Sequence, residues 1–271
     1  MPRTTTPAEL VTALLRLAGP APIGILFDYD GTLVDFTARP DLAHVDPETN
    51  DRLMRLAQSR RARVGIITGR SLSGLKAVAG PLDGVALAVN GGLRIVTPEQ
   101  DWTQPDALHL KPALAKIAAA LADPVARWPG ALIESKDFGL TVHFRQAPEA
   151  GAALEAAAGE IVARIGAGFR MLAGKMSFEV QPAVDWNKGD AATALLDGWG
   201  VEEAALFVGD DRIDEPAFSE VRIRGGLACR VGPSHEDSAA QWSLDTPSDA
   251  RELLGRLVEA LAKGGPATWR N

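Results

Sequence analysis

The fold class follows from one segment of the chain, Ile23-Gly24-Ile25-Leu26-Phe27-Asp28-Tyr29-Asp30-Gly31-Thr32. Residues 23–27 are wholly apolar, which is typical of a short strand that is buried on both faces of a parallel sheet. Two aspartates follow at the end of this strand, and Gly31 permits the tight turn that the position needs. We therefore expect an α/β protein with its polar chemistry beyond the strand ends.

Three more short apolar runs repeat this pattern at residues 64–67, 85–89 and 204–208. Each run stops at polar or glycine-rich residues, namely Thr68, Asn90-Gly91-Gly92 and Gly209-Asp210-Asp211. Asp46-Pro47 opens a predicted helix between the first two strands, which gives a β-α-β unit. Because ligands of open α/β sheets bind beyond the carboxyl ends of parallel strands, we expect these polar residues to share one site.

The middle of the chain follows a different pattern. Its predicted strands alternate polar and apolar residues, as in residues 140–144, which indicates an antiparallel sheet with one exposed face. We predict a separate α+β domain at residues 106–182, inserted into a core domain made of residues 1–105 and 183–271. The insert is predicted to hold helices at 108–122 and 147–165 and strands at 131–136, 140–145, 169–173 and 177–181. Outside it, helices are predicted at 7–19, 187–196 and 247–262.

The composition excludes several classes of protein. Hydrophobic residues make up 46% of the 271 residues and charged ones 23%, so the chain can bury a core and is not a disordered tract. The net charge of −7 argues against nucleic acid or an anionic membrane as partner. No apolar run approaches the roughly 18–20 residues that span a bilayer. The apolar stretch at residues 10–15 is too short, and too closely flanked by Glu9 and Arg16, for a signal peptide, so we expect a cytoplasmic protein. The single cysteine, Cys229, can form no internal disulfide and is expected to be a buried, inert thiol. We further expect a monomer that acts on a small molecule.

The two aspartates at 28 and 30 admit more than one interpretation. In a catalytic one, Asp28 is an ionised nucleophile and Asp30 moves a proton, with a bound cation separating their roles. A calcium loop is excluded by its spacing, because Leu33 stands where that loop needs glycine and Arg39 stands where it needs glutamate. A simple acidic turn is the remaining alternative. A P-loop at residues 168–176 is excluded as well, because its spacing is wrong and it lacks the hydroxyl residue.

The segment Asp28-Tyr29-Asp30-Gly31-Thr32 resembles the first signature of the haloacid dehalogenase superfamily of phosphotransferases. Thr68 at a strand end, Lys188 at a helix start and the acidic cluster at 209–215 are similar to its three other signatures, and they occur in the same order. This resemblance implies a Rossmann-like core with a parallel sheet. It also implies that Asp28 attacks phosphorus, that Asp30 serves as the acid and base, and that Thr68 and Lys188 bind the phosphoryl oxygens.

The same resemblance implies a Mg²⁺ cofactor. The ion would take the Asp28 carboxylate, the Asp30 carbonyl oxygen and Asp210, with Asp211 and Asp214 as further ligands or as groups that orient water and Lys188. Mg²⁺ prefers such hard oxygen ligands, and its charge explains how an acidic protein can bind a phosphate.

Four longer segments, at residues 133–145, 174–182, 186–189 and 209–218, are similar to trehalose-6-phosphate phosphatases. The insert then corresponds to the α/β cap, of the C2 type, through which such enzymes choose their substrate. The family implies a list of sugar-binding and substrate-binding residues, which is Gly69, Arg70, Glu134, Lys136, Arg145, Lys175 and Glu179. We expect His143 and Phe144 to serve the packing of the insert itself.

Three positions depart from the family pattern, which usually has histidine at Gly91, arginine at Gln181 and threonine at Ile213. The resemblance predicts Mg²⁺-dependent hydrolysis of trehalose 6-phosphate through an aspartyl-phosphate. Because two donors are missing, other enzymes stay open: a phosphatase for sucrose or mannosylglycerate phosphate, or a phosphomannomutase-like isomerase. A regulator that binds sugar phosphates without catalysis is the alternative outside enzymes.

Overall fold

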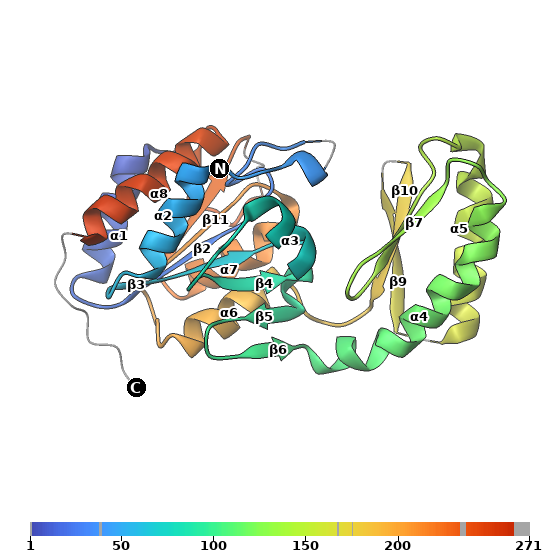
Figure 1. The fold of residues 1–271 in the computed structure, drawn as a ribbon. Coiled ribbons are helices and arrows are strands. Elements are labelled where there is room, and N and C mark those ends of the chain that lie inside the picture. The colour runs from blue at the N-terminus through green and yellow to red at the C-terminus, as the bar shows by residue number, and fades with distance from the viewer. Residues whose placement is uncertain (1, 38–39, 167, 175, 234–236, 263–271) are drawn as a thin grey trace. The chain divides into compact units, whose positions relative to one another are not determined.

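The computed structural model describes residues 2–37, 40–166, 168–174, 176–233 and 237–262 (Figure 1). Lys175, one of the predicted substrate-binding residues, lies outside the described residues. The described chain falls into two compact units, made of residues 1–102 with 186–271 and of residues 103–185. None of the helices that the structure describes is both long enough and apolar enough to cross a bilayer.

The larger unit is built on one sheet of nine described strands, in the order β1-β13-β12-β11-β2-β3-β4-β5-β6. Every pair from β1 to β4 along this order is parallel, and β5 runs antiparallel to β4. The strands are β1 Arg3–Thr4, β2 Ile23–Phe27, β3 Ala62–Ile67, β4 Ala86–Val89, β5 Arg94–Val96, β6 Asp101–Thr103, β11 Ala205–Gly209, β12 Leu227–Val231 and β13 Trp242–Leu244. The predicted parallel sheet is confirmed, with β2 at its centre.

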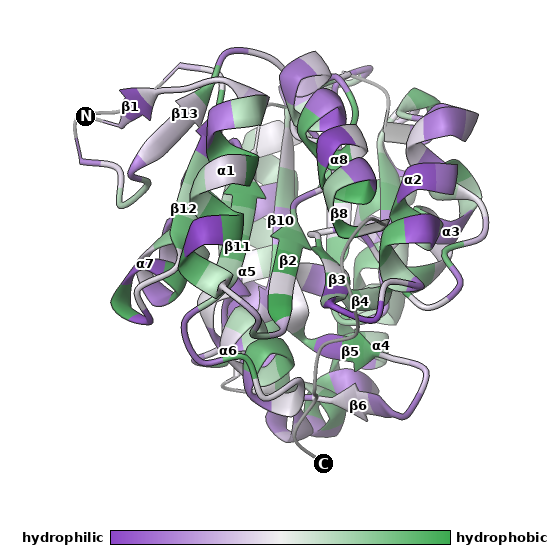
Figure 2. Cartoon of the chain, turned by 90° about the vertical axis from the view of Figure 1, so that its left-hand side faces the viewer, coloured by the Kyte–Doolittle hydropathy of each residue, from purple (hydrophilic) through white to green (hydrophobic). Residues whose placement is uncertain are grey.

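Helices cover both faces of this sheet (Figure 1). One apolar cluster joins the side chains of α1, α2, α3 and α8 to those of Ile25 and Phe27, and a second joins α6 and α7 to Leu26, which points the other way. Buried strands therefore read as continuous apolar runs, and β2 and β11 are correspondingly green in Figure 2. The elements are α1 Pro7–Ala18, α2 Pro47–Ala57, α3 Leu72–Ala79, α6 Lys188–Gly198, α7 Glu215–Ile223 and α8 Pro247–Ala262, with short 3₁₀ turns η1 Pro40–Leu42, η2 Asn90–Gly92 and η4 Arg212–Asp214.

The smaller unit is an antiparallel sheet of four described strands in the order β7-β8-β10-β9. Alternate side chains of these strands pack on α4 and α5 in a core of their own, as predicted from the alternating pattern. Its elements are α4 Pro105–Ala126, β7 Leu132–Ser135, β8 Leu140–His143, η3 Pro148–Ala150, α5 Gly151–Ile165, β9 Phe169–Gly174 and β10 Ser177–Pro182.

One prediction about this unit is wrong. Phe144 is buried in its core as expected, but the side chain of His143 is half-exposed and bonds Glu134 instead of packing inside. The physical reason is the two-residue period of a strand. Val142 and Phe178 point into the core in register with each other, so His143, the next residue after Val142, must point to the opposite face.

Candidate active site

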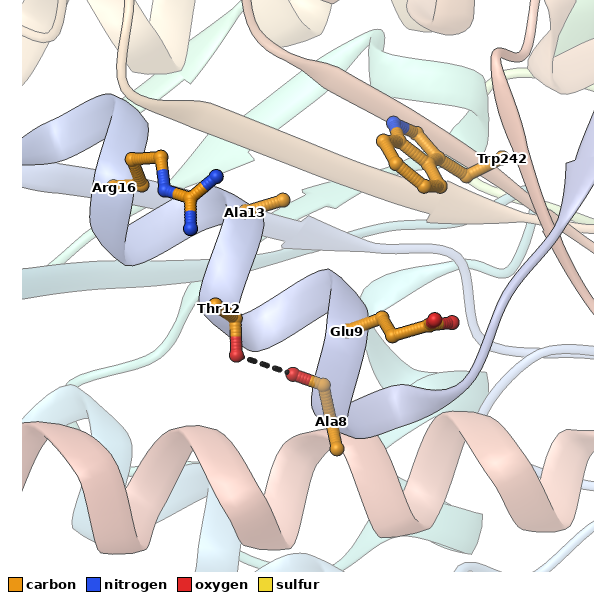
Figure 3. Close-up of a pocket in the computed structure, with 6 residues that line it drawn as sticks. All are labelled: Ala8, Glu9, Thr12, Ala13, Arg16 and Trp242. Carbon is orange, nitrogen blue, oxygen red and sulfur yellow. Dashed lines mark hydrogen bonds between the residues drawn. The ribbon is translucent and has the colours of Figure 1, made fainter.

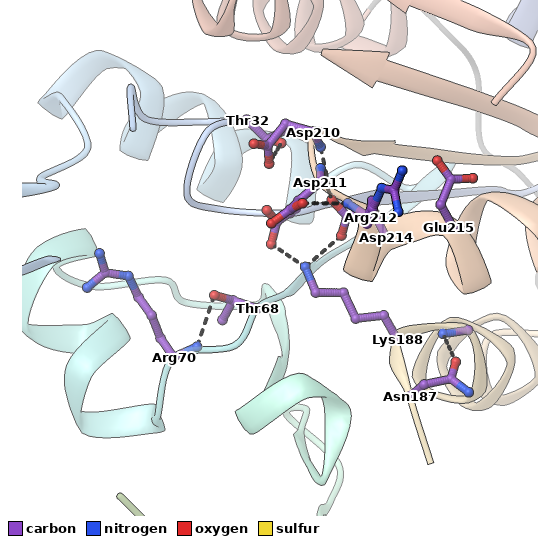
Figure 4. Close-up of polar contacts among 12 residues, drawn as sticks. Thr32, Thr68, Arg70, Asn187, Lys188, Asp210, Asp211, Arg212, Asp214 and Glu215 are labelled. Atoms are coloured by element: carbon purple, nitrogen blue, oxygen red, sulfur yellow. Dashed lines mark hydrogen bonds and ion pairs between the residues drawn. The ribbon is translucent and has the colours of Figure 1, made fainter. Parts of the chain in front are cut away.

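The strand order brings together the residues that follow β11, β2 and β3, because the carboxyl ends of parallel strands meet at one edge (Figure 4). Lys188 is the centre of this group. Its Nζ lies 2.7 Å from Asp28 Oδ1 and 2.6 Å from Asp214 Oδ1, and its side chain is only 3% exposed. Desolvation would lower the pKa of this lysine, but the two carboxylates outweigh it and raise the pKa above its usual value. Lys188 is therefore a fixed positive charge between two acids.

Local structure places Lys188 at the first turn of α6. The Asn187 side chain accepts from the Gly189 N–H, and the Asp190 carboxylate accepts from the Asn187 N–H, which makes a capping box. Just before this cap, the Trp186 indole N–H donates to the Gly92 carbonyl at 2.9 Å and its ring packs on Trp102 with centroids 4.9 Å apart. Sequence reasoning found the cap but gave Trp186 no role, because its partner lies 94 residues away.

Asp210 approaches the opening loop closely enough to require glycine there. Gly31 has a φ of +78°, and a Cβ at this position would lie 2.1 Å from Asp210 Oδ2. The Thr32 hydroxyl donates to Asp210 Oδ1 at 3.4 Å. Thr32 belongs to the quoted motif, but only the fold shows that its hydroxyl reaches a carboxylate 178 residues further along the chain.

Both carboxylate oxygens of Asp214 accept hydrogen bonds from other groups of the protein. Oδ2 accepts from the N–H groups of Asp210 and Asp211 at 2.9 and 3.0 Å, and Oδ1 accepts from Lys188. A Cβ on Gly209 would lie 2.5 Å from Oδ2, so the carboxylate can turn back onto its own loop only because that residue is glycine. Asp211 is exposed and accepts from the Arg212 N–H. Asp214 therefore organises the loop and the lysine.

Among the described residues, Asp28, Asp210 and Asp214 bring carboxylate oxygens to within 4.8 Å of one another. Burial is the main reason that the pKa of Asp28 is raised, and burial together with the charge of Asp214 raises the pKa of Asp210 to about 6. Lys188 supplies only one positive charge to three acids, so the group has an excess of negative charge in a poorly solvated place. A metal ion that takes oxygen ligands fits this donor set and would relieve the repulsion.

Asp30 is held by Arg70 in a two-point ion pair. Arg70 Nε lies 2.7 Å from Oδ2 of Asp30 and Nη2 lies 2.6 Å from Oδ1, while the guanidinium also sits over the ring of buried Tyr29. These contacts outweigh the desolvation that would lower the pKa of Arg70 and raise that pKa instead. Arg70, a predicted substrate-binding residue, thus contacts Asp30 through its guanidinium.

The strand end after β3 presents Thr68 and Gly69 beside this pair. Thr68 is buried, and its Oγ1 accepts from the Arg70 N–H at 3.2 Å. Its backbone is fixed from both sides, because its N–H donates to Ala88 and its carbonyl accepts from Gly91. A Cβ at Gly69 would meet nothing within 4 Å, so this glycine borders open space.

The remaining predicted residues lie in the smaller unit. Lys136 Nζ bonds Glu179 Oε1 at 2.9 Å, His143 Nε2 bonds Glu134 Oε2 at 2.8 Å, and Arg145 is exposed just beyond β8. Of the three positions that depart from the family pattern, Gly91 has a φ of +70°, Ile213 is 58% exposed and Gln181 accepts from Arg170 at 3.5 Å.

A depression of about 330 Å³ lies elsewhere in the larger unit, between α1 and β13 (Figure 3). Its lining is Ala8, Glu9, Thr12, Ala13, Arg16 and Trp242. The Glu9 carboxylate is engaged by the N-terminal cap of α1, and the Thr12 hydroxyl donates to the Ala8 carbonyl. None of the catalytic candidates lines this depression.

Comparison with known proteins decides the family. A family model described as trehalose-phosphatase matches residues 26–248. The chain belongs to the trehalose-phosphatase family. It is 31% identical over 264 residues to the "Probable trehalose-phosphate phosphatase C" of Arabidopsis thaliana. That match covers 93% of this chain and 81% of the relative's length. It is 32% identical over 259 residues to a trehalose-phosphate phosphatase of Mycobacterium avium, covering 92% of this chain but only 65% of the relative's length.

Solved structures confirm the fold class. The C-terminal domain of C. albicans trehalose-6-phosphate phosphatase aligns with a TM-score of 0.73 at 22% identity and covers 96% of this chain and 98% of that one. A haloacid dehalogenase-like hydrolase from Bacteroides thetaiotaomicron aligns with a TM-score of 0.61 at 17% identity, covering 87% of this chain and 99% of that one. The chain therefore shares the fold of these proteins, and its core is built on the predicted, mainly parallel sheet.

Proposed function

We propose that this protein hydrolyses trehalose 6-phosphate to trehalose and inorganic phosphate. The observation that carries the proposal is Lys188, which joins Asp28 to Asp214 beside Asp210 in a chain of the trehalose-phosphatase family. Residues 1–105 with 183–271 form the catalytic core, and residues 106–182 form the cap that selects the sugar.

Asp28 is the nucleophile. Its carboxylate attacks phosphorus in line, the bond from phosphorus to the sugar oxygen breaks, and the phosphoryl group is carried on Asp28 as an aspartyl-phosphate. Lys188, already 2.7 Å from Asp28, and Thr68 neutralise and position the equatorial oxygens. The N–H groups of Asp28 and Gly31 already donate to backbone carbonyls. The loop N–H groups that would donate to the phosphoryl oxygens are therefore those of Tyr29 and Asp30.

Asp30 moves the protons. It protonates the leaving sugar oxygen in the first step and, as a carboxylate, takes a proton from the water that hydrolyses the aspartyl-phosphate in the second. The two-point contact with Arg70 fixes the position of this carboxylate, and the guanidinium of Arg70 in turn lies over the ring of Tyr29.

The metal we propose is Mg²⁺. Asp28, Asp210 and the Asp30 carbonyl would hold it, while Asp214 orients the loop and Lys188, and Asp211 stands close enough in sequence to orient water. When bound, Mg²⁺ supplies positive charge that the transferring phosphoryl group needs and that one lysine cannot provide.

We propose that Glu134, Lys136, Arg145, Lys175 and Glu179 of the smaller unit recognise the sugar, and that Gly69 and Arg70 of the larger unit also bind substrate. Charge-assisted hydrogen bonds from such groups suit the hydroxyls of a disaccharide. Gly91 and Gln181 remove two donors that the family usually has, so a phosphatase for a related glycosyl phosphate is the second candidate.

The test is release of inorganic phosphate from a panel of trehalose 6-phosphate, sucrose 6-phosphate, mannosyl-3-phosphoglycerate and mannose 1-phosphate, with Mg²⁺ and with a chelator. We expect trehalose 6-phosphate to be the best substrate and the chelator to abolish turnover. A better rate on another member of the panel reassigns the substrate. Binding of sugar phosphate without any turnover in saturating Mg²⁺ would identify a regulator, and isomerised sugar without phosphate release would identify a mutase.

A further inference from the structure

The face of the smaller unit's sheet opposite its core carries a group of polar side chains beside the exposed Leu132 and Leu172. We call it the open face and define it by Glu134, Thr141, His143 and Glu179. The register places Glu134 on β7, Thr141 on β8 and Glu179 on β10 in one row across the sheet. His143 belongs to the next row on the same face, because it is two residues beyond Thr141.

The direction of the Glu134 carboxylate is set by His143. The residue directly opposite Glu134 is Thr141, whose hydroxyl could donate to it. Instead, Oε2 of Glu134 lies 2.8 Å from Nε2 of His143, the diagonal neighbour. The Oγ1 of Thr141, a residue only 6% exposed, finds no hydrogen-bond partner among the described residues. The imidazole therefore draws the carboxylate away from its nearest donor.

The second carboxylate of the row is held in a matching way. Glu179 bonds through Oε1 to Lys136, whose ammonium crosses β8 to reach it at 2.9 Å. Lys136 is itself fixed, because its N–H donates to the Gly139 carbonyl in a turn whose buried Phe138 packs under the Lys111 ammonium. Each of the two carboxylates thus uses one oxygen to bond one basic side chain, His143 for Glu134 and Lys136 for Glu179.

We propose that His143 is a positioning residue for sugar recognition: it holds Glu134 by one oxygen so that the other can accept from a sugar hydroxyl, as Lys136 does for Glu179. The inference rests on the proposed function, since it deepens the role of Glu134 in the cap. A carboxylate that is ordered before the sugar arrives loses less side-chain freedom on binding. An imidazole is suited to this task because its side chain is short and planar. It can therefore reach the carboxylate only in a narrow range of positions.

The experiment is a double-mutant cycle on KM for trehalose 6-phosphate, with His143→Ala, Glu134→Ala and the double variant. We expect His143→Ala to raise KM about 3- to 10-fold, the range for loss of order in one side chain. In the Glu134→Ala background the same change should have no further effect, because His143 acts through Glu134. His143→Gln, which keeps an N–H donor, should restore most of the wild-type KM.

Two controls separate positioning from a structural role. Thr141→Val removes the hydroxyl that lacks a partner without changing volume and should leave KM unchanged. The kcat/KM for 4-nitrophenyl phosphate, which has no sugar, should change less than 2-fold in the His143 variants. Equal losses on both substrates, or an undiminished effect of His143→Ala in the Glu134→Ala background, would overturn the inference.

Failure of the proposed function is seen separately. It appears in the wild-type protein as poor turnover of trehalose 6-phosphate, before any variant is made. The cycle is then run on whichever sugar phosphate of the panel the wild type hydrolyses best. The coupling between His143 and Glu134 is confirmed or refuted there by the same criteria.

Discussion

Gly31 is the residue on which the geometry of the acidic site depends most sharply, so Gly31→Ala is the most informative single change. Its φ of +78° lies in the left-handed region, where a residue with a Cβ costs roughly 1–2 kcal/mol. The new methyl carbon would stand 2.1 Å from Asp210 Oδ2 and 2.5 Å from its Cγ. Contacts of this kind do not fall below 3.0 Å, so the carboxylate must retreat by about 1 Å.

A shift of that size at Asp210, a proposed metal ligand, predicts two separate effects. We expect the Mg²⁺ concentration for half-maximal activity to rise about 10- to 100-fold, as it does when groups that orient a metal ligand are disturbed. We expect kcat/KM at saturating Mg²⁺ to fall by about 10²-fold, because Asp210 no longer matches the positions of Asp28 and Lys188. The midpoint of thermal unfolding should fall by roughly 2–8 °C.

The assay is phosphate release over a Mg²⁺ titration, with Gly69→Ala as the matched control. Gly69 borders the same site, but its added Cβ would meet nothing within 4 Å. It should therefore leave the Mg²⁺ requirement and the unfolding midpoint near wild type, whatever it does to substrate affinity. If Gly31→Ala kept the wild-type Mg²⁺ requirement, or if Gly69→Ala changed it as much, the close approach of Asp210 to the opening loop would not be what holds the metal site together.

Further predictions concern the nucleophile Asp28, the Arg70 contact with Asp30, the Trp186 hydrogen bond that precedes Lys188, and the pH dependence of Mg²⁺ binding. Asp28→Asn should abolish turnover on every substrate while the circular dichroism spectrum stays native, and residual turnover above about 1% of wild type would contradict a covalent role. Arg70→Gln should lower kcat/KM for the sugar phosphate about 10- to 100-fold, and that for 4-nitrophenyl phosphate several-fold less, because the nitrophenolate leaving group needs no proton. Arg70→Lys should lose less activity than Arg70→Gln. Equal losses on the two substrates would argue against a role through Asp30. Trp186→Phe leaves the Gly92 carbonyl without its donor and should cost about 1 kcal/mol, measured as a lower unfolding midpoint, and an unchanged midpoint would show that this bond is replaced by water. Because the pKa of Asp210 is raised to about 6, protons compete with the metal below that pH: the Kd of Mg²⁺ from calorimetry should be nearly constant above pH 7 and rise steadily as the pH falls through 6, whereas a constant Kd down to pH 5 would show that Asp210 is not a ligand.

The sequence by itself determined many of the longer elements and the edge of the sheet at which the candidate site lies. Apolar runs, their two-residue or continuous pattern, and caps such as Thr6 and Asn187 are local signals, and local hydrogen bonds satisfy them in the folded chain. The short strands β1, β5, β6 and β13, of two or three residues each, were not predicted, because a period cannot be seen over so few positions. The five-residue strand β12 and the helices α3 and α7 were not predicted either.

Only the tertiary structure decided how the site residues divide their contacts. The motifs left Asp211 and Asp214 either as metal ligands or as groups that orient water and Lys188. In the structure Asp214 bonds Lys188 and its own loop, and Asp211 is exposed. Arg70 bonds Asp30 across 40 residues, and Asp210 meets the opening loop across more than 170. Such contacts depend on which strands become neighbours and how closely two loops can approach. No local pattern encodes those distances, because they are set by the packing of helices on both faces of the sheet.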